Sequence, residues 1–238
     1  MTWYPGADRP GTELEPGVRV ERRNVLLAAF AAPLALAPRV EDDDPPGFEG
    51  FLDLAAKAAR PLMGPEVGNE DAYLYSLASH LATVTELPAD GFGEIDDGLR
   101  FARDGERSAG DAEHQRIRAI QIGFAPGAAI PIHDHLEYNG LILCLDGEMR
   151  CRNFDVVEEK DGGEVVLRET VDALLTPGRF STLSTTRDNL HELVAGPNGC
   201  RVLDVFTYFT ERATSRYLKF AGEAPLDAAR KTFAARWS

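Results

Sequence analysis

The sequence contains little cysteine, with only three thiols among its 238 residues. Cys144, Cys151 and Cys200 form no Cys-x-x-Cys pair and no spaced framework. Their scarcity argues against a disulfide-stapled domain and against a zinc site built from cysteine. We interpret the three side chains as small members of a hydrophobic core.

Long apolar runs and an excess of basic charge are also missing. No apolar run approaches the roughly 18 residues that a membrane-spanning helix needs. Lysine and arginine number 25 against 39 acidic residues, which gives a net charge of −14. Because an acidic surface repels phosphate backbones and anionic lipid, binding to nucleic acid and to a bilayer surface is disfavoured.

The first 44 residues are predicted to be a disordered lead that contains an apolar stretch. Arg22 and Arg23 precede the uncharged residues Val25–Ala37. This pattern resembles a twin-arginine export signal over residues 22–37. The alternative is a buried apolar helix, since one proline interrupts the stretch and another stands where cleavage would occur. The sequence therefore leaves a cytoplasmic and an exported location both open.

Residues 45–110 are predicted to form a helical extension and a linker. "GFEGFLDLAAKAARPLMG" and "NEDAYLYSLASHLATVTELP" each place apolar side chains on one side at helical spacing. His80 lies beside the second stripe, where a lone histidine is more often a packed or surface residue than a ligand. Residues 88–114 are rich in glycine and aspartate and are expected to be irregular. The tail, residues 213–238, is rich in charge and alanine and predicts one or two closing helices.

Residues 111–212 have the pattern of a β domain. Short apolar or alternating runs such as "RIRAIQIGF", "EVVLRET" and "CRVLDVFTYF" are separated by turn pairs, among them Asp146-Gly147 and Pro177-Gly178. Many short strands at close spacing predict an all-β sandwich or barrel.

The stretch "IPIHDHLEYNG" carries the strongest chemical signal. On a strand, side chains alternate between faces, so His133 and His135 share one face and Asp134 takes the other. Two imidazoles on an inward face are costly to leave unpaired, and a divalent metal would bind both. Gly127 before the pair and Gly147 after it give a spacing that resembles the first motif of the cupin superfamily.

His191, in "DNLHELVAGPNG", is the third candidate ligand, because it follows His135 at a place that agrees with the second cupin motif. The usual cupin glutamate is absent, since its positions hold Asn139 and Gly140. Glu137 is nearby, but we expect the chain to turn there and to place this side chain at the pocket mouth. Three neutral histidines leave a divalent ion with its full charge, which favours an incoming thiolate. The alternative is three unrelated structural histidines.

The stretches "IPIHDHLEYNGLILCLDGEMRCRNFD" and "DNLHELVAGPNGCRVLDVF" resemble the thiol dioxygenases of the cysteamine dioxygenase and plant cysteine oxidase family. The resemblance covers roughly residues 115–210. It implies a mainly β cupin fold, a double-stranded jelly-roll-like barrel, here with an N-terminal helical extension and a C-terminal helix. It also implies mononuclear iron(II) held by His133, His135 and His191. An acid after the third histidine, here Asp204, is implied to act in the outer sphere.

The implied reaction is oxidation of a thiol by O2 to a sulfinic acid. The chain departs from the family after Asp204, where "FTYFT" replaces paired prolines and a tyrosine, so Tyr208 is the nearest candidate for that tyrosine. The neighbouring cysteine dioxygenases bind a carboxylate through an arginine, and none of Arg107, Arg116 and Arg118 stands out for that role. We therefore expect a small amino-thiol or a cysteine-led peptide as substrate and a monomeric protein. The alternatives are a different metal-dependent cupin enzyme and a non-catalytic cupin that senses a small molecule.

Overall fold

The computed structural model of the chain describes residues 47–64, 68–84, 92, 96–222 and 224–238. The predicted lead and export signal lie outside these residues. Within the described part, no helix is both long enough and apolar enough to span a membrane.

Two helices precede the strands. α1 spans Phe48–Ala59, the 3₁₀ turn η1 spans Arg60–Leu62, and α2 spans Glu70–Leu81. α1 passes into the 3₁₀ turn at Arg60, whose N–H donates to the carbonyl of Lys57, because the proline that follows has no N–H to continue the α-helical hydrogen bonds. α2 begins after Asn69, whose side chain accepts a hydrogen bond from the N–H of Ala72 at 2.9 Å. The predicted N-terminal helices are confirmed.

The strands that follow pair only in antiparallel fashion within the described residues. In chain order they are β1 (Leu99–Ser108), β2 (Arg116–Phe124), β3 (Ala129–Asp134), β4 (Tyr138–Glu159), β5 (Glu164–Leu175), β6 (Phe180–Leu183), β7 (Leu190–Tyr208), β8 (Leu218–Phe220) and β9 (Thr232–Trp237). The 3₁₀ turn η2 (Asp161–Gly163) joins β4 to β5.

β4 and β7 are much longer than the other strands and pair along most of their length, with Tyr138 opposite Tyr208 at one end. The register of this pair shifts beside Gly147, whose φ is 71°. A Cβ at Gly147 would lie 2.9 Å from the Cα of Cys200, which is closer than real contacts allow. Glycine at this position therefore permits the left-handed backbone and the close approach of the two strands.

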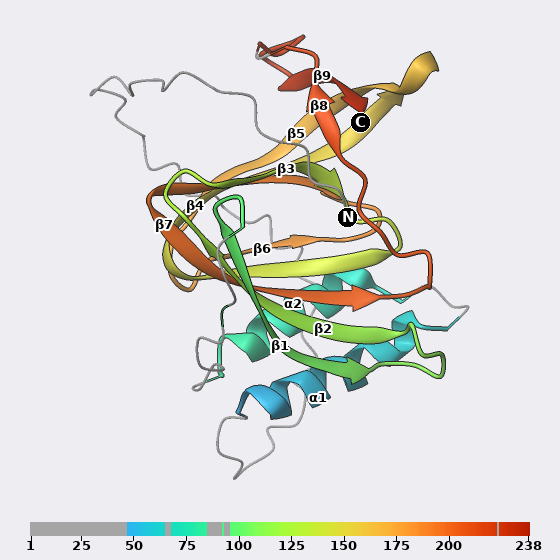
Figure 1. Cartoon of the computed structure of the whole chain (residues 1–238). Helices are drawn as coiled ribbons and strands as arrows, with labels where there is room; N and C mark the ends of the chain where they lie inside the picture. The colour runs from blue at the N-terminus through green and yellow to red at the C-terminus, as the bar shows by residue number, and fades with distance from the viewer. Residues whose placement is uncertain (1–46, 65–67, 85–91, 93–95, 223) are drawn as a thin grey trace. The chain divides into compact units, whose positions relative to one another are not determined.

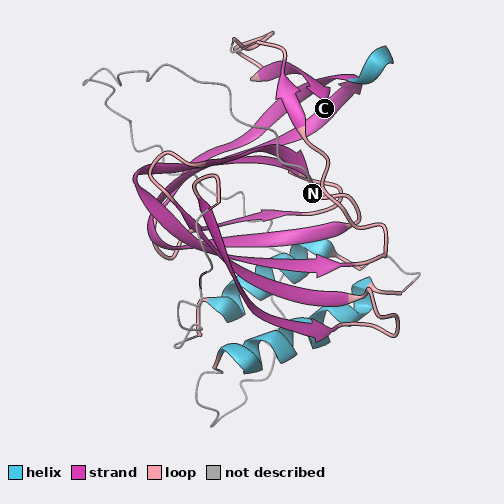
Figure 2. Ribbon diagram, in the orientation of Figure 1, coloured by secondary structure: helices cyan, strands magenta, loops and turns pink. Residues whose placement is uncertain are grey.

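The sheet divides into two half-sheets, and each of them contains one half of the long β4–β7 pair. β1, β2 and β6 extend the half-sheet that contains the start of β4 and the end of β7. β3, β5, β9 and β8 extend the other. The result is one curled antiparallel sheet with two helices on one side (Figures 1 and 2).

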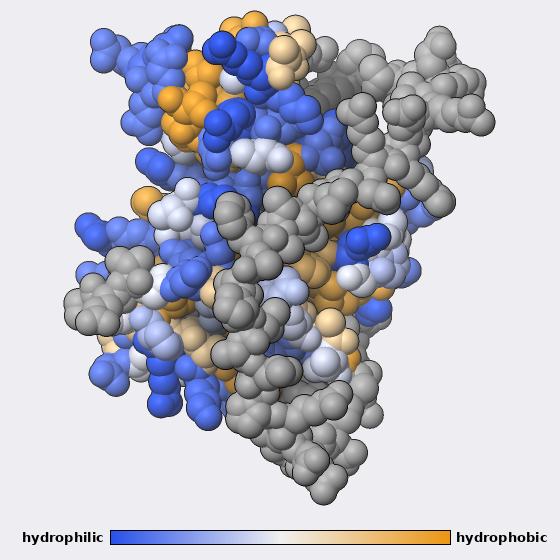
Figure 3. All heavy atoms as spheres, turned by 180° about the vertical axis from the view of Figure 1, so that it is seen from behind, coloured by the Kyte–Doolittle hydropathy of each residue, from blue (hydrophilic) through white to orange (hydrophobic). Residues whose placement is uncertain are grey.

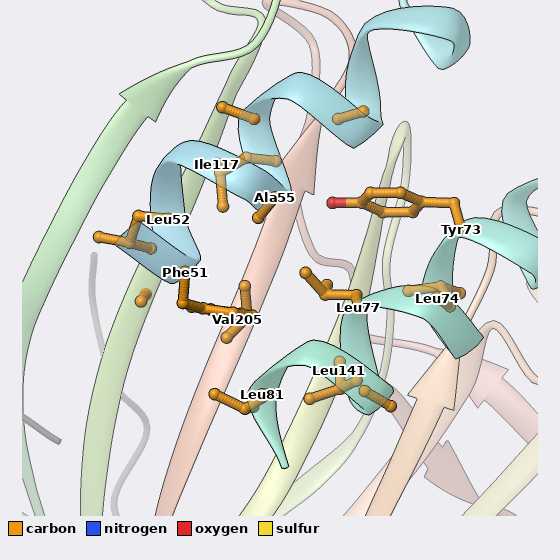
Figure 4. Packing of buried hydrophobic residues seen from close by; sticks show 14 of the residues in the cluster. Phe51, Leu52, Ala55, Tyr73, Leu74, Leu77, Leu81, Ile117, Leu141 and Val205 are labelled. Atoms are coloured by element: carbon orange, nitrogen blue, oxygen red, sulfur yellow. The ribbon is translucent and has the colours of Figure 1, made fainter. Parts of the chain in front are cut away.

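The outer face of the first half-sheet is covered by the two helices. Phe51 and Leu52 of α1 and Leu77 of α2 are at most 2% exposed, and they pack in one cluster with Ile117 and Leu141 of the strands (Figure 4). Burying a large apolar side chain in this way contributes about 1.5–3 kcal/mol. The helices are thus attached to the sheet by a continuous core.

The inner face of the curled sheet holds a second apolar cluster. Ile122, Ile142 and Val202 of the first half-sheet pack there with Met149 and Leu193 of the second. Because side chains alternate along a strand, the residues two positions from these also face inward. This alternation decides which polar residues can meet inside the sheet.

Much of the described surface that is visible in Figure 3 is hydrophilic, with apolar patches between the polar groups. Exposed apolar side chains of this kind are ordinary on protein surfaces. The acidic composition predicts a polar exterior, and this face agrees with it.

The predicted C-terminal helix is wrong. β8 and β9 lie in this tail and pair with each other, and β9 also pairs with β5. Leu218 and Ala235 are each 2% exposed and pack in one cluster with Phe154 and Leu167. The second half-sheet offers an edge strand and an apolar surface, and these outweigh the helical propensity of a tail rich in alanine and charge.

The stretch that was expected to be irregular before the barrel also contains a strand. β1 pairs with β2 over its whole length and shifts register between Arg103 and Gly105. The irregularity in the middle of β1 breaks its alternation, so the sequence pattern alone does not show the strand.

Candidate metal centre

Three histidines meet inside the curled sheet. His133 of β3 and His191 of β7 are direct cross-strand partners, and His135 follows the end of β3. Their residues are 7%, 1% and 1% exposed, in the order His133, His191, His135. One ring nitrogen from each lies within 4.8 Å of the others, and the Nε2 atoms of His133 and His191 are 3.0 Å apart. Such a cluster can hold a metal ion.

The ring orientation of His133 is fixed by a hydrogen bond on the side of the ring that points away from His191. Its Nδ1 lies 2.9 Å from the carbonyl oxygen of Pro131. A carbonyl only accepts, so Nδ1 carries the proton and donates. The lone pair of His133 therefore lies on Nε2, the atom that faces His191, which is the arrangement that metal-binding histidines adopt.

His135 is held through its backbone. Asn189 donates from its side-chain amide to the carbonyl of His135 at 3.1 Å, and the N–H of His135 donates to the carbonyl of Asn189 at 3.2 Å. Asn189 stands two residues before His191, so the loop that leads into β7 fixes two of the three histidines together.

All three imidazoles are held in the neutral form that binds metals. Burial lowers the pKa of His133, and it lowers the pKa of His135 and His191 well below the usual value. Electrostatic repulsion from His133 adds to the effect at both. Nδ1 of His135 and Nδ1 of His191 have no hydrogen-bond partner among the described residues. A neutral imidazole keeps one nitrogen lone pair free, and a metal ion that bound these lone pairs would offset the cost of burying the three rings.

The position of the usual cupin carboxylate lies against His135. A Cβ at Gly140 would stand 3.1 Å from Cε1 and 3.2 Å from Nδ1 of that ring. A side chain at position 140 would crowd the imidazole ring of His135. The absence of the usual glutamate therefore permits the observed position of this ring. Glu137 has a left-handed φ of 60° and contacts Thr210 and Arg212. It is not part of the cluster, and its exclusion as a ligand stays a prediction.

Aromatic rings surround the histidines. Tyr138 stacks on His135 with ring centroids 4.3 Å apart, and Tyr208 stacks on Tyr138 at 5.2 Å. Phe206 lies 5.9 Å from His135. These rings exclude water from one side of the cluster. Sequence reasoning found only Tyr208, although alternation along β7 places Phe206 on the same face.

Asp204 faces the same interior. It lies on β7 opposite Ile120 and Ile142 and is 4% exposed. Burial raises the pKa of its carboxyl well above the usual value. Its charge also contributes, after burial, to the raised pKa of Tyr208, so the two groups are electrostatic neighbours.

The arginines before the motif divide into two groups. Arg116 and Arg118 place their guanidinium groups 5.2 and 5.5 Å from the ring centre of Tyr208, and both pair with Glu106. Their side chains are only 28% and 21% exposed, so these two arginines are partly buried beside the tyrosine. Arg107 instead pairs with acidic residues of α1.

A segment that the sequence did not single out borders the centre. Residues 213–217, here called the C-terminal strap, run antiparallel to the end of β3, with hydrogen bonds of 2.9 Å from the N–H of Asp134 to Arg216 and from the N–H of Leu136 to Thr214. The strap places the ring of Tyr217 5.5 Å from that of His133. No local pattern predicts this contact, because it depends on where the tail folds back.

The curled antiparallel sheet and the three inward histidines define a cupin-type metal site. The PCO_ADO family model, which represents cysteamine dioxygenases and plant cysteine oxidases, matches residues 113–234. The match covers β2 to β8, the start of β9 and all three histidines, and this chain belongs to that family. Membership and the histidine cluster together indicate a metal-dependent thiol dioxygenase.

Solved structures give more distant likenesses. KdgF from Halomonas sp. is 14% identical, with a TM-score of 0.36 over 51% of this chain and 94% of KdgF. An RmlC-like cupin from Shewanella frigidimarina is 19% identical, with a TM-score of 0.37 over 53% of this chain and 92% of that one. The cupin domain of Schizosaccharomyces pombe Cnp3 is 12% identical, with a TM-score of 0.36 over 51% of this chain and 70% of that one. No curated protein matched the chain.

Proposed function

We propose that this chain is a non-haem iron(II) dioxygenase that oxidises a thiol with O2 to a sulfinic acid. The observation that carries the proposal is a buried cluster of three neutral histidines, without a carboxylate, in a member of this family. His133, His135 and His191 would hold the iron. When bound there, iron(II) keeps its full positive charge and supplies adjacent positions for a thiolate and for O2.

The residues around the cluster support binding of an amino-thiol. Asp204 is a buried carboxyl with a raised pKa, so it prefers a proton or a cationic partner to an isolated charge. An amine on the substrate would provide that partner, and this favours a small amino-thiol or an N-terminal cysteine. Asp204 then orients the substrate and does not bind iron.

Tyr208 is the second side chain near the cluster that we expect to contact the substrate. Burial raises the pKa of its phenol, so the hydroxyl stays protonated at neutral pH and can donate a hydrogen bond to a substrate. Arg116 and Arg118 lie over the ring and hold it in place. The aromatic side chains keep water away from the thiol, which protects the reaction from side products.

The test joins metal analysis to oxygen uptake. Iron-loaded protein should consume O2 only with a thiol present, across a panel of small amino-thiols, mercapto-acids and cysteine-led peptides. With labelled dioxygen, both oxygens of the sulfinate should carry the label. His133→Ala, His135→Ala and His191→Ala should each lose iron or activity, whereas His80→Ala and His114→Ala should lose neither. Iron-loaded protein without thiol-dependent uptake would refute the dioxygenase and favour a sensor.

A further inference from the structure

Helix α2 lies outside the part of the chain that matches the family, yet its first turn contacts residues that neighbour the histidine cluster. Glu70 accepts a hydrogen bond from the N–H of Thr185 at 2.9 Å and a second from the hydroxyl of Thr185. It also accepts from the side-chain amide of Asn139 at 3.4 Å. Both oxygens of this carboxylate thus accept hydrogen bonds from residues that lie far away in the sequence.

Each partner of Glu70 is connected to His135 through another residue. Thr185 belongs to the loop of residues 184–189, in which Asn189 donates to the carbonyl of Ser184 at 2.9 Å and to the carbonyl of His135 at 3.1 Å. Asn139 directly precedes Gly140, whose backbone lies against the ring of His135. A movement of Glu70 would therefore reach His135 through both its backbone and its ring.

A second pair of contacts joins the same turn to the same loop. Arg187 donates to Asp71 at 2.7 and 2.9 Å and also contacts Asp188. Tyr73, further along α2, forms a buried hydrogen bond of 2.8 Å with Thr207, the cross-strand partner of Asn139. Tyr73 also belongs to the apolar cluster under α2, whereas the contacts of Glu70 and Asp71 are made by charged side chains outside that cluster.

We infer that Glu70 is a positioning residue of the metal centre: it fixes Asn139 and the loop of residues 184–189, and through them the orientation of His135. The inference rests on the proposed function, in which His135 binds iron. It implies that the helical extension is part of the site and is more than a structural support. Glu70 itself touches neither metal nor substrate.

The experiment measures Co(II) binding to the metal-free full chain, both as a dissociation constant and as the visible absorption of the bound ion. Glu70→Gln keeps the size of the side chain but puts a donor where an acceptor is needed. We expect Co(II) binding to weaken by about 10-fold, with a changed absorption spectrum. Glu49→Gln is the control, because it is the same substitution in the first turn of α1, where Glu49 pairs with Arg107 away from the site, and it should leave Co(II) binding and the spectrum unchanged.

A Co(II) affinity and spectrum for Glu70→Gln equal to those of Glu49→Gln would overturn the inference. Should Glu70→Gln fail to fold, Thr185→Val, which removes one hydroxyl, must give a smaller change of the same kind, and an unchanged spectrum would overturn the inference as well. The variant His133→Ala distinguishes failure of the proposed function from failure of the role inferred for Glu70. Retained Co(II) in His133→Ala contradicts the proposed function, whereas its loss there combined with an unaffected Glu70→Gln contradicts only the role of Glu70.

Discussion

At the scale of single residues, burial shifts the pKa of the groups that are proposed to form the site. His133, His135 and His191 are kept neutral, and the carboxyl of Asp204 favours its proton. The interior thus provides three neutral imidazoles and one acid that, among the described residues, has no cationic partner. Each of these properties comes from the removal of water, not from the residue type alone.

We predict that Asp204→Asn keeps iron and loses turnover by about 10- to 100-fold, the usual cost of altering a group that supports a metal site. Initial rates with the best thiol and the iron content of the same samples would check this. Retained iron with unchanged rates would assign Asp204 a structural role only.

Asp204→Asn, which is expected to lower turnover, is expected to raise the stability of the metal-free protein. The folded pKa of Asp204 is raised above 3.8, so the stability from its protonated form is complete below that pH and is lost as the pH rises through the folded pKa. Metal-free Asp204→Asn should therefore be more stable than the original protein at pH 8, with a smaller gap at pH 5. Urea unfolding at both pH values measures the difference in stability between the variant and the original protein. A difference that narrows with rising pH would contradict the raised pKa of Asp204.

At the scale of elements, the C-terminal strap is fastened by one charged pair. Arg216 donates from Nη2 and Nε to Asp134 at 2.6 and 2.8 Å, and its guanidinium lies 4.2 Å from the ring centre of Trp237 in β9. The side chain of Asp134 is only 3% exposed. The aspartate between the two histidines of the motif therefore joins the histidine strand to the tail of the chain.

We predict that Arg216→Ala lowers the free energy of unfolding by about 1–3 kcal/mol, because it leaves a buried carboxylate without its charged partner. The half-exposed guanidinium keeps the loss below that of a fully buried pair. Arg236→Ala is the matched control, since Arg236 of β9 pairs with Glu164 at 3.1 Å where both side chains are more than half exposed. That control should change stability by about 0.5 kcal/mol or less. Equal effects of the two variants in urea unfolding would show that the strap is not held by this pair.

At the scale of the whole molecule, the proposed metal ligands come from separate strands of one curled sheet. His133 lies on β3 and His191 on β7, so an ion that binds both can do so only when the two strands are paired. Metal binding and folding are therefore coupled.

We predict that a divalent ion at 100 times its dissociation constant adds about 2.7 kcal/mol to the free energy of unfolding. Anaerobic urea unfolding with and without Fe(II), or with Co(II) in its place, measures the gain. His191→Ala should abolish it, and His80→Ala, on the exposed side of α2, should preserve it. A gain that survives His191→Ala would place the stabilising ion elsewhere.

The sequence by itself determined the parts of this protein that depend on local periodicity. The alternation of a strand puts His133 and His135 on one face, and helical spacing in residues 48–81 produces two helices with apolar stripes. The spacing from Gly127 to Gly147, with a later histidine at His191, was enough to predict the cluster, and the resemblance of the stretches around the histidines indicated the family. These features follow from chain geometry over a few residues.

Only the tertiary structure decided the rest. The tail has the composition of a helix, but it forms β8 and β9 because β5 offers an open edge and an apolar surface to cover. The contact of Tyr217 with His133 and that of Glu70 with Thr185 join residues far apart in the chain. Their partners are set by how the half-sheets curl and where the helices pack. No local sequence pattern predicts which distant residues will be in contact, because the free energy that favours these contacts comes from the packing of the whole domain.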